Sequence, residues 1–145
     1  MFVRNTSYLH AMNSSTDKSA KKIEPTKAEL EILQVLWLYG PSTVRFVNDK
    51  LNERTRTVQY SSTLKLMQIM NSKGMLKRDD SNMKHVYSPA EDEHKTKNYL
   101  LERFVNSMYN GSASSLVMQL LGNKKTSAKE LRMIKEMLDK LDTNK

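Results

Sequence analysis

The feature that most constrains the fold is the spacing of apolar residues after position 25, which predicts three consecutive amphipathic helices. These helices are expected over residues 26–39, 43–53 and 57–72. Thr26 and Glu29 have the spacing of a capping box at the start of the first helix. The residues expected to face the core recur at helical spacing; they are Leu30, Leu33, Trp37, Val44, Val47, Leu51, Thr63, Leu66, Ile69 and Met70.

Two short strand-like stretches follow the third helix. Residues 75–78 form the first, residues 79–82 favour a turn, and residues 84–87 alternate polar with apolar side chains. Pro89 is expected to end the unit. Three helices followed by a two-stranded hairpin are the elements of a winged helix-turn-helix. The predicted fold class is therefore mainly α with a small β-wing.

The rest of the chain predicts three more helices, over residues 92–109, over residues 112–121 and from Ser127 onward. Roughly 50 residues of amphipathic helix are too few to close a core of their own. We therefore expect their apolar stripes to pair two copies of the chain in a homodimer, with packing on the winged helix as the alternative. The side chains assigned to dimerisation are Leu101, Phe104, Val105, Met108, Leu116, Val117, Leu120, Leu121, Leu131, Ile134 and Leu138.

The predicted domain order is a disordered arm (1–23), a winged-helix DNA-binding domain (24–90) and a helical dimerisation domain (91–145). The arm is polar, lacks the apolar core of a secretory signal, and contains Met12 as an alternative start. No apolar stretch approaches the roughly 20 residues that span a bilayer, so no membrane insertion is expected. The chain has no cysteine, which excludes disulfides and thiolate metal sites and suits a reducing cytoplasm.

The net charge of +8 favours an anionic partner, and the basic residues are unevenly distributed. Residues 1–88 carry 14 Lys or Arg against 8 Asp or Glu, a net of +6, and residues 54–78 contain no acid. The third helix lies in this acid-free span and starts with small polar side chains, which suits insertion into the major groove; a solvated basic face is the alternative. The side chains expected to contact double-stranded DNA are Arg56, Gln59, Tyr60, Ser61, Ser62, Lys65, Lys73, Arg78 and Lys84.

The sequence does not favour an enzyme, a metal site or a cofactor. His10 lies in the expected arm and His85 in the wing. The acids that precede His94 are explained by the helix dipole, which favours negative charge at a helix N-terminus. The chain has no metalloprotease motif, phosphate-binding loop or nucleophile elbow. The alternatives that stay open are a winged helix for non-specific DNA binding or protein contact, and a sensor of a small molecule.

Four segments carry a resemblance to a known family: TKAELEILQVLW, YSSTLKLMQIMNSKGML, HVYSP and NGSASSLVMQLL. They resemble the penicillinase repressor family over about residues 24–142. The resemblance implies a cytoplasmic, nucleoid-associated homodimer that represses a nearby operon through a dyad operator built around TACA and TGTA. It also implies base contacts from Tyr60, Ser61, Ser62 and Lys65.

The resemblance also implies a mode of induction. In several members a membrane sensor with a metalloprotease domain leads to cleavage of the repressor in its dimerisation region, often at an Asn-Phe bond. The matching position here is Gln119-Leu120, which departs from that pattern. The chain also lacks the C-terminal cysteine motif of the copper-responsive branch, so the resemblance implies no copper sensing through thiolates.

Overall fold

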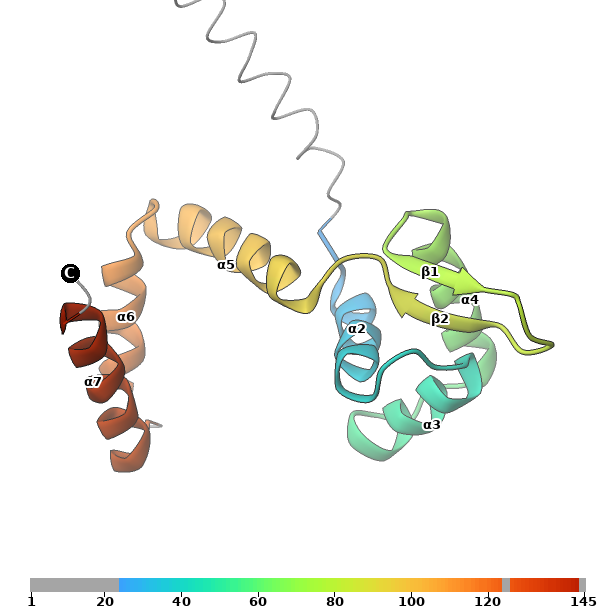
Figure 1. Ribbon diagram of the computed structural model, residues 1–145, viewed down its shortest axis with the longest axis horizontal. Coiled ribbons are helices and arrows are strands. Elements are labelled where there is room, and N and C mark those ends of the chain that lie inside the picture. Colours follow the sequence, from blue (N-terminus) through green and yellow to red (C-terminus); the bar gives the residue numbers. More distant parts are fainter. Residues whose placement is uncertain (1–23, 124–125, 144–145) are drawn as a thin grey trace, which may run out of the picture. The chain divides into compact units, whose positions relative to one another are not determined.

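The computed structural model describes residues 24–123 and 126–143 (Figure 1). The predicted arm, residues 1–23, lies outside the described residues. The described chain divides into two compact units, one that ends at Thr96 and one that begins at Lys97. The elements in chain order are α2 (Lys27–Tyr39), α3 (Val44–Arg54), α4 (Tyr60–Ser72), β1 (Leu76–Asp79), β2 (Val86–Pro89), α5 (Glu93–Tyr109), α6 (Ala113–Leu121) and α7 (Ala128–Thr143).

The first two helices begin at side-chain caps. The predicted capping box of α2 is confirmed, because the Thr26 backbone N–H donates to Glu29 Oε1 (2.9 Å) and the Glu29 N–H donates to Thr26 Oγ1 (3.2 Å). Gly40 ends α2 at φ 85°, a backbone conformation that favours glycine. The hydroxyl of Thr43 then caps α3 by accepting from the Phe46 N–H (3.2 Å). These local signals explain why the predicted bounds of both helices are correct to within a residue.

The core of the first unit lies between α2, α3, α4 and the two strands. Its buried apolar side chains are Ile32, Leu33, Val35, Leu36, Val44, Val47, Leu51, Met67, Met70, Leu76 and Tyr87. The prediction that Ile69 faces this core is wrong, because 40% of its side chain is exposed whereas Met67 is fully buried. At 3.6 residues per turn, Thr63, Met67 and Met70 share the buried side of α4, and Ile69 falls on its flank.

The wing is a two-stranded antiparallel sheet. Its register pairs Leu76 with Pro89 and Asp79 with Val86, so both strands begin later than predicted. Met75 belongs to the turn that ends α4, because its N–H donates to the Met70 carbonyl (2.9 Å), so β1 begins at Leu76. Asp79 Oδ1 accepts from the Ser81 N–H (2.9 Å), and residues 80–85 form the connecting loop outside the ladder. On its other side β2 forms a single bridge to Ser42 in the α2–α3 connection.

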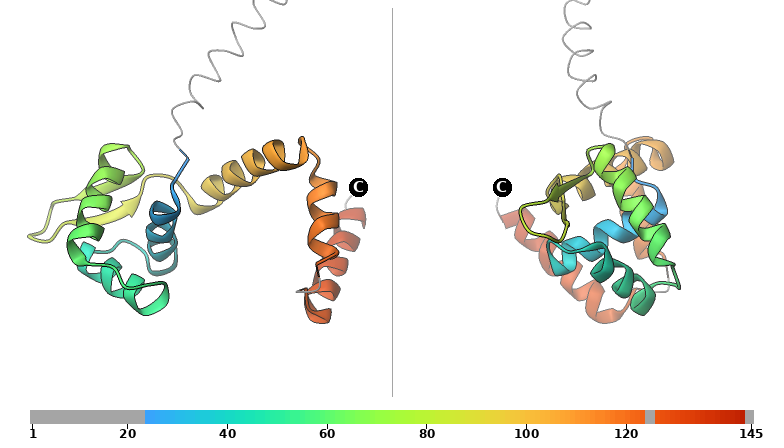
Figure 2. Two further views of the ribbon diagram at one scale, coloured as in Figure 1. Left: turned by 180° about the vertical axis from the view of Figure 1, so that it is seen from behind. Right: turned by 90° about the vertical axis from the view of Figure 1, so that its right-hand side faces the viewer.

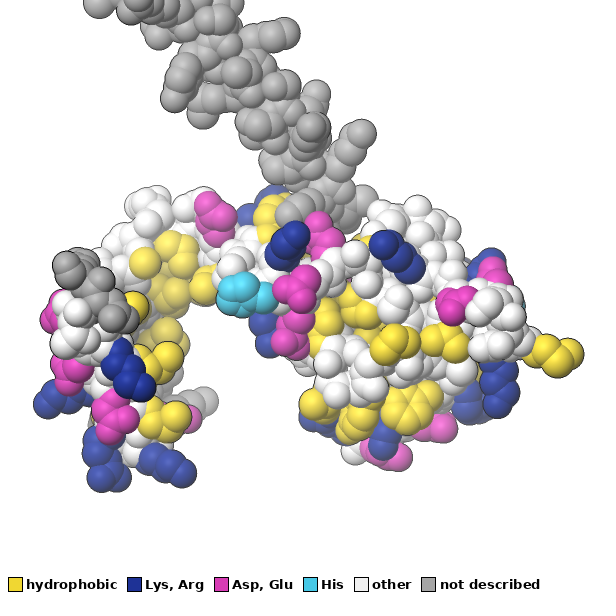
Figure 3. Space-filling model, in the orientation of Figure 1, with side chains coloured by type: hydrophobic (Ala, Val, Ile, Leu, Met, Phe, Trp, Pro, Cys, Tyr) yellow, Lys and Arg dark blue, Asp and Glu magenta, His cyan; other side chains and the backbone are white. Residues whose placement is uncertain are grey.

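The second unit holds most of α5 together with α6 and α7. The α5 helix ends at Asn110-Gly111, both at positive φ, where the chain turns into α6 (Figure 2). Ser112 caps α6 by accepting from the Ser115 N–H (3.2 Å), a cap that the sequence analysis did not predict. Ser127 and Glu130, whose spacing in the sequence is that of a capping box, form one at the start of α7. No described residue of these helices is buried, and hydrophobic side chains gather along one side of them (Figure 3).

Candidate nucleic-acid interface

The turn that leads into α4 is held by two asparagines of α3. Asn48 Nδ2 donates to the Val58 carbonyl (3.0 Å) and to the buried hydroxyl of Thr63 (2.8 Å). Asn52 bonds both backbone groups of Val58: its Nδ2 donates to the carbonyl (3.1 Å) and its Oδ1 accepts from the N–H (2.8 Å). These bonds fix where α4 begins, which is the end that a recognition helix inserts into DNA.

The outward face of α4 is polar and basic. Gln59, Tyr60, Ser61, Ser62 and Lys65, all predicted from the sequence, are exposed. Gln59 is the N-cap residue, and its side chain makes no capping hydrogen bond. The structure thus brings the predicted base-contacting side chains together at the first two turns of one helix, where they point away from the core.

The sequence prediction missed Gln68, which is also exposed on α4. Ser61, Lys65 and Gln68 recur at intervals of four and three, so they share the face opposite the buried Thr63 and Met67. This spacing was the signal in the sequence that could have identified Gln68.

Arg45 of α3 is a second residue that the sequence prediction missed. Its Cζ atom lies 4.3 Å from the centroid of the Tyr60 ring, a cation–π contact between α3 and the first residue of α4. Arg45 lies nine residues before the acid-free span begins at Arg54, so the charge pattern gave no reason to select it. The contact places a guanidinium beside the aromatic ring at the start of α4.

A hollow of about 500 Å³ lies between α3, α4 and the wing. Its basic lining side chains are Arg45, Arg78 and Lys84, joined by His85 and Gln68. The cations gathered here come from three elements, as a surface that follows a phosphate backbone requires.

Asp80 offsets part of this positive charge. Its carboxylate pairs with Arg78 Nε (2.9 Å) and bonds the His85 ring. The hydrogen bond from His85, followed by that from Arg78, holds the pKa of Asp80 below its ordinary value. Asp80 therefore stays ionised and orients Arg78, while Lys84 remains exposed at the wing.

Two predicted DNA-binding cations form ion pairs with α2. Lys73 Nζ pairs with Glu29 Oε2 (3.1 Å), and Arg56 Nε lies 3.5 Å from Glu31 Oε2. Burial raises the pKa of Glu29, but hydrogen bonds from the Thr26 backbone and from Lys73 outweigh it, so the pKa is lowered overall. The Lys73 pair joins α2 to the end of α4, and the Arg56 pair joins α2 to the turn between α3 and α4. DNA contact by Lys73 or Arg56 stays a prediction.

No group of three or more acidic or histidine side chains in residues 24–123 and 126–143 is arranged to hold a metal ion. Within the same part of the chain, no helix combines the length and apolar character needed to cross a membrane.

Comparison with known proteins decides the family. A family model described as penicillinase repressor matches residues 25–140. The chain belongs to the penicillinase repressor family. It is 29% identical over 122 residues to the penicillinase repressor of Bacillus licheniformis, an alignment that covers 82% of this chain and 93% of that relative. Membership identifies the chain as a transcriptional regulator of a repressor family rather than of an enzyme family.

Two solved structures are also similar. A MarR family protein from Bacillus stearothermophilus matches with a TM-score of 0.49 and 18% identity, over 98% of this chain and 94% of that one. A transcriptional regulator from Thermotoga maritima matches with a TM-score of 0.49 and 20% identity, over 99% of this chain and 96% of that one.

In this member of the penicillinase repressor family the side chains predicted to form the dimer surface are largely open to solvent. The half-buried ones are Val105, Leu116 and Ile134. The exposed ones are Leu101, Phe104, Met108, Val117, Leu120, Leu121, Leu131 and Leu138. Four further exposed apolar side chains of α6 and α7 are absent from the residues assigned to dimerisation: Met118, Met133, Met137 and Leu141. The site matched to the family's cleavage position, Gln119-Leu120, lies near the end of α6 and is exposed.

Proposed function

We propose that this chain is a homodimeric repressor that binds a two-fold symmetric operator in the cytoplasm and blocks transcription of adjacent genes. The observation that carries the proposal is the outward face of α4, where Ser61, Lys65 and Gln68 are exposed on a helix whose opposite side is locked in the core. Hydroxyl, amide and ammonium groups are the donors and acceptors that match base edges in the major groove.

In this proposal the contacts divide between bases and phosphates. The exposed face of α4 contacts base edges, while Arg45, Arg78 and Lys84 around the hollow contact the backbone on either side. Each phosphate that is neutralised adds about 0.9 to the slope of log K against log salt. A dimer that makes roughly 6–10 such contacts should therefore lose affinity steeply as the salt concentration rises.

The apolar stripes of α5, α6 and α7 support pairing with a second copy. An exposed leucine such as Leu120, at 55% exposure, gains by burial against a partner. Dimerisation presents the second winged helix at high effective concentration, which raises apparent affinity by about 10²–10⁴. Any event that separates the protomers, including cleavage near Gln119-Leu120 by a membrane sensor protease, would then release the operator without altering a base contact.

The test compares two duplexes of equal length in fluorescence anisotropy at one fixed salt concentration. One duplex carries TACA and TGTA half-sites as a dyad, and the other carries the same bases in scrambled order. The proposal expects the dyad to bind roughly 10³-fold or more tightly. Equal affinity for both would favour non-specific DNA binding instead, and binding to neither would favour a protein partner.

A further inference from the structure

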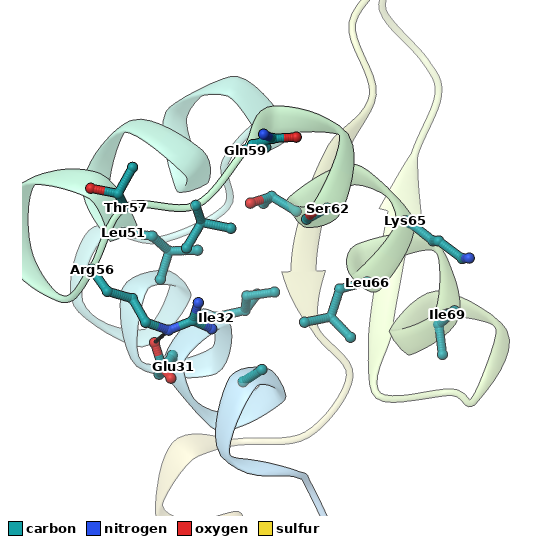
Figure 4. A pocket seen from close by; sticks show the side chains of 13 residues that line it. Glu31, Ile32, Leu51, Arg56, Thr57, Gln59, Ser62, Lys65, Leu66 and Ile69 are labelled. Atoms are coloured by element: carbon teal, nitrogen blue, oxygen red, sulfur yellow. Dashed lines mark ion pairs between the residues drawn. The ribbon is translucent and has the colours of Figure 1, made fainter.

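A cavity of about 550 Å³ lies on the flank of α4 that faces away from the wing (Figure 4). It is bounded by α2, by the turn that joins α3 to α4, and by α4 itself. Ile32 from α2 and Leu66 from α4 face one another across it, and Leu51 and Ile69 extend its apolar wall. This volume lies within the roughly 300–1,000 Å³ typical of small-molecule sites.

The cavity contains one acidic group that is incompletely paired. The Glu31 side chain is 13% exposed, and its Oε2 atom is buried without a hydrogen-bond donor among the described residues. Arg56 Nε lies 3.5 Å from that oxygen, beyond the roughly 2.7–2.9 Å of a charge-assisted hydrogen bond. Because 54% of the Arg56 side chain is exposed, the guanidinium can be displaced into solvent at small cost.

From the apolar walls and this carboxylate we infer that the cavity binds a small organic cation with an apolar body. Its amidinium or ammonium group donates to Glu31 Oε2 in place of Arg56, and its apolar part packs between Ile32 and Leu66. Lys65 lies at the outer rim and points away from the cavity centre, so it repels a second positive charge there (Figure 4). The site therefore suits a monocation rather than a polyamine.

The position of the cavity links this ligand to DNA, and that part of the inference rests on the proposed function. Gln59, Ser62 and Lys65 line the cavity and also belong to the exposed start of α4. A ligand that occupies this flank therefore lies against the same end of α4 that contacts the operator in the proposed function. Its binding and operator binding should therefore oppose each other.

The experiment titrates the full-length protein with benzamidine, a planar monocation, and follows the backbone amide signals by NMR. Shifts should concentrate at Ile32, Leu66 and Ile69. Benzamide, its neutral isostere, should bind at least roughly tenfold more weakly. Shifts that are scattered over the surface, or equal binding of the two probes, would overturn the inference.

Two variants locate the site. Glu31→Gln keeps the shape of the side chain and should weaken benzamidine binding roughly tenfold or more. The matched control is Glu53→Gln, which neutralises a carboxylate paired with Lys50 on the exposed side of α3 and should leave binding unchanged. Ile69→Trp, at a position that is 40% exposed, should narrow the cavity without disturbing the core and abolish binding. Benzamidine affinity equal to that of the parent in Glu31→Gln or in Ile69→Trp would refute the site.

A separate arm measures DNA binding at constant ionic strength, with sodium chloride replacing benzamidine in the control. Saturating benzamidine should weaken binding of the dyad duplex, and unchanged or tighter binding would refute the opposition between the ligand and DNA. Failure of the proposed function would be recognised separately, as equal affinity for dyad and scrambled duplexes in the absence of any ligand.

Discussion

Replacing Asn48 by alanine should destabilise the first unit by about 2–3 kcal/mol, because this buried side chain donates two hydrogen bonds and accepts a third from Asn52 Nδ2 (3.2 Å). The bond to the Val58 carbonyl is partly replaceable, since Asn52 Nδ2 donates to the same oxygen. The bond to the Thr63 hydroxyl cannot be replaced in this way. Thr63 is 1% exposed, so its hydroxyl would lose this donor. Leaving a buried polar group unpaired costs about 1–3 kcal/mol, and a lost hydrogen bond costs about 0.5–1.5 kcal/mol.

The assay is a double-mutant cycle of Asn48→Ala and Thr63→Val, measured by urea unfolding at one protomer concentration. If the two side chains stabilise each other, Asn48→Ala should cost roughly 0.5–3 kcal/mol less when Thr63 is already valine. Operator affinity of Asn48→Ala should also fall, because the turn before α4 loses part of its support. Effects that add within about 0.5 kcal/mol would refute the argument that this pair positions the recognition helix.

Three other predictions concern DNA binding, assembly and acid stability. Lys84→Ala, which removes a cation that contacts a phosphate in the proposed function, should lower the slope of log K against log salt by about 0.9. Gln68→Ala should reduce discrimination between dyad and scrambled duplexes and leave the slope unchanged. Anisotropy over a salt series separates the two, and identical slopes in both variants would contradict these roles. Leu120→Ala should weaken the dimer by about 2–5 kcal/mol in sedimentation velocity on dilution. The control is Leu38→Ala, because Leu38 of α2 is 59% exposed and Leu120 is 55% exposed. Leu38→Ala should not weaken the dimer, and an equal effect of the two variants on dimer stability would place Leu120 outside the interface. Because the folded-state pKa of Glu29 lies below its ordinary 4.5, its stabilising contribution is present above that pH and is lost as the pH falls through the folded value. Glu29→Gln should therefore lower stability at neutral pH and flatten the acid limb of the unfolding free energy below about pH 5, and an unchanged limb would show that the Glu29–Lys73 pair contributes nothing.

The limits of α2 and α3 could be predicted from the sequence because their determinants are local, whereas α4, expected from residue 57, begins at Tyr60 after the turn that Asn48 and Asn52 hold at Val58. Thr26 and Glu29 are three residues apart, as are Ser127 and Glu130, so each capping box can be recognised from four consecutive residues of the sequence. The strand register was harder to predict from the sequence, because it depends on how Asp80 in the connecting loop pairs with Arg78 and His85. The spacing of apolar residues alone did not determine which loop length would form.

Contacts between distant residues lay beyond sequence reasoning. Lys73 and Glu29 are 44 residues apart, and Asn48 and Thr63 are 15 apart, so no spacing rule connects them. The phase error at Ile69 has a similar origin: α4 offers two overlapping apolar stripes, and only packing against α2 and α3 selects the one that contains Met67. Gln68 was missed for a different reason, because the predicted contact residues of α4 lie only in its first two turns.

The bridge between Ser42 and Tyr87 has a consequence for how the wing moves. Backbone hydrogen bonds run both ways across it, from Ser42 N to Tyr87 O (3.0 Å) and from Tyr87 N to Ser42 O (2.8 Å), and the Tyr87 side chain is only 1% exposed. The bridge thereby tethers β2 to the helical scaffold at Tyr87, whose strand partner Arg78 lies next to the last pair of the ladder before the connecting loop. The Tyr87 amide hydrogen should therefore exchange with solvent as slowly as those of the helices, whereas amides of residues 80–85, which lie outside the ladder, should exchange faster.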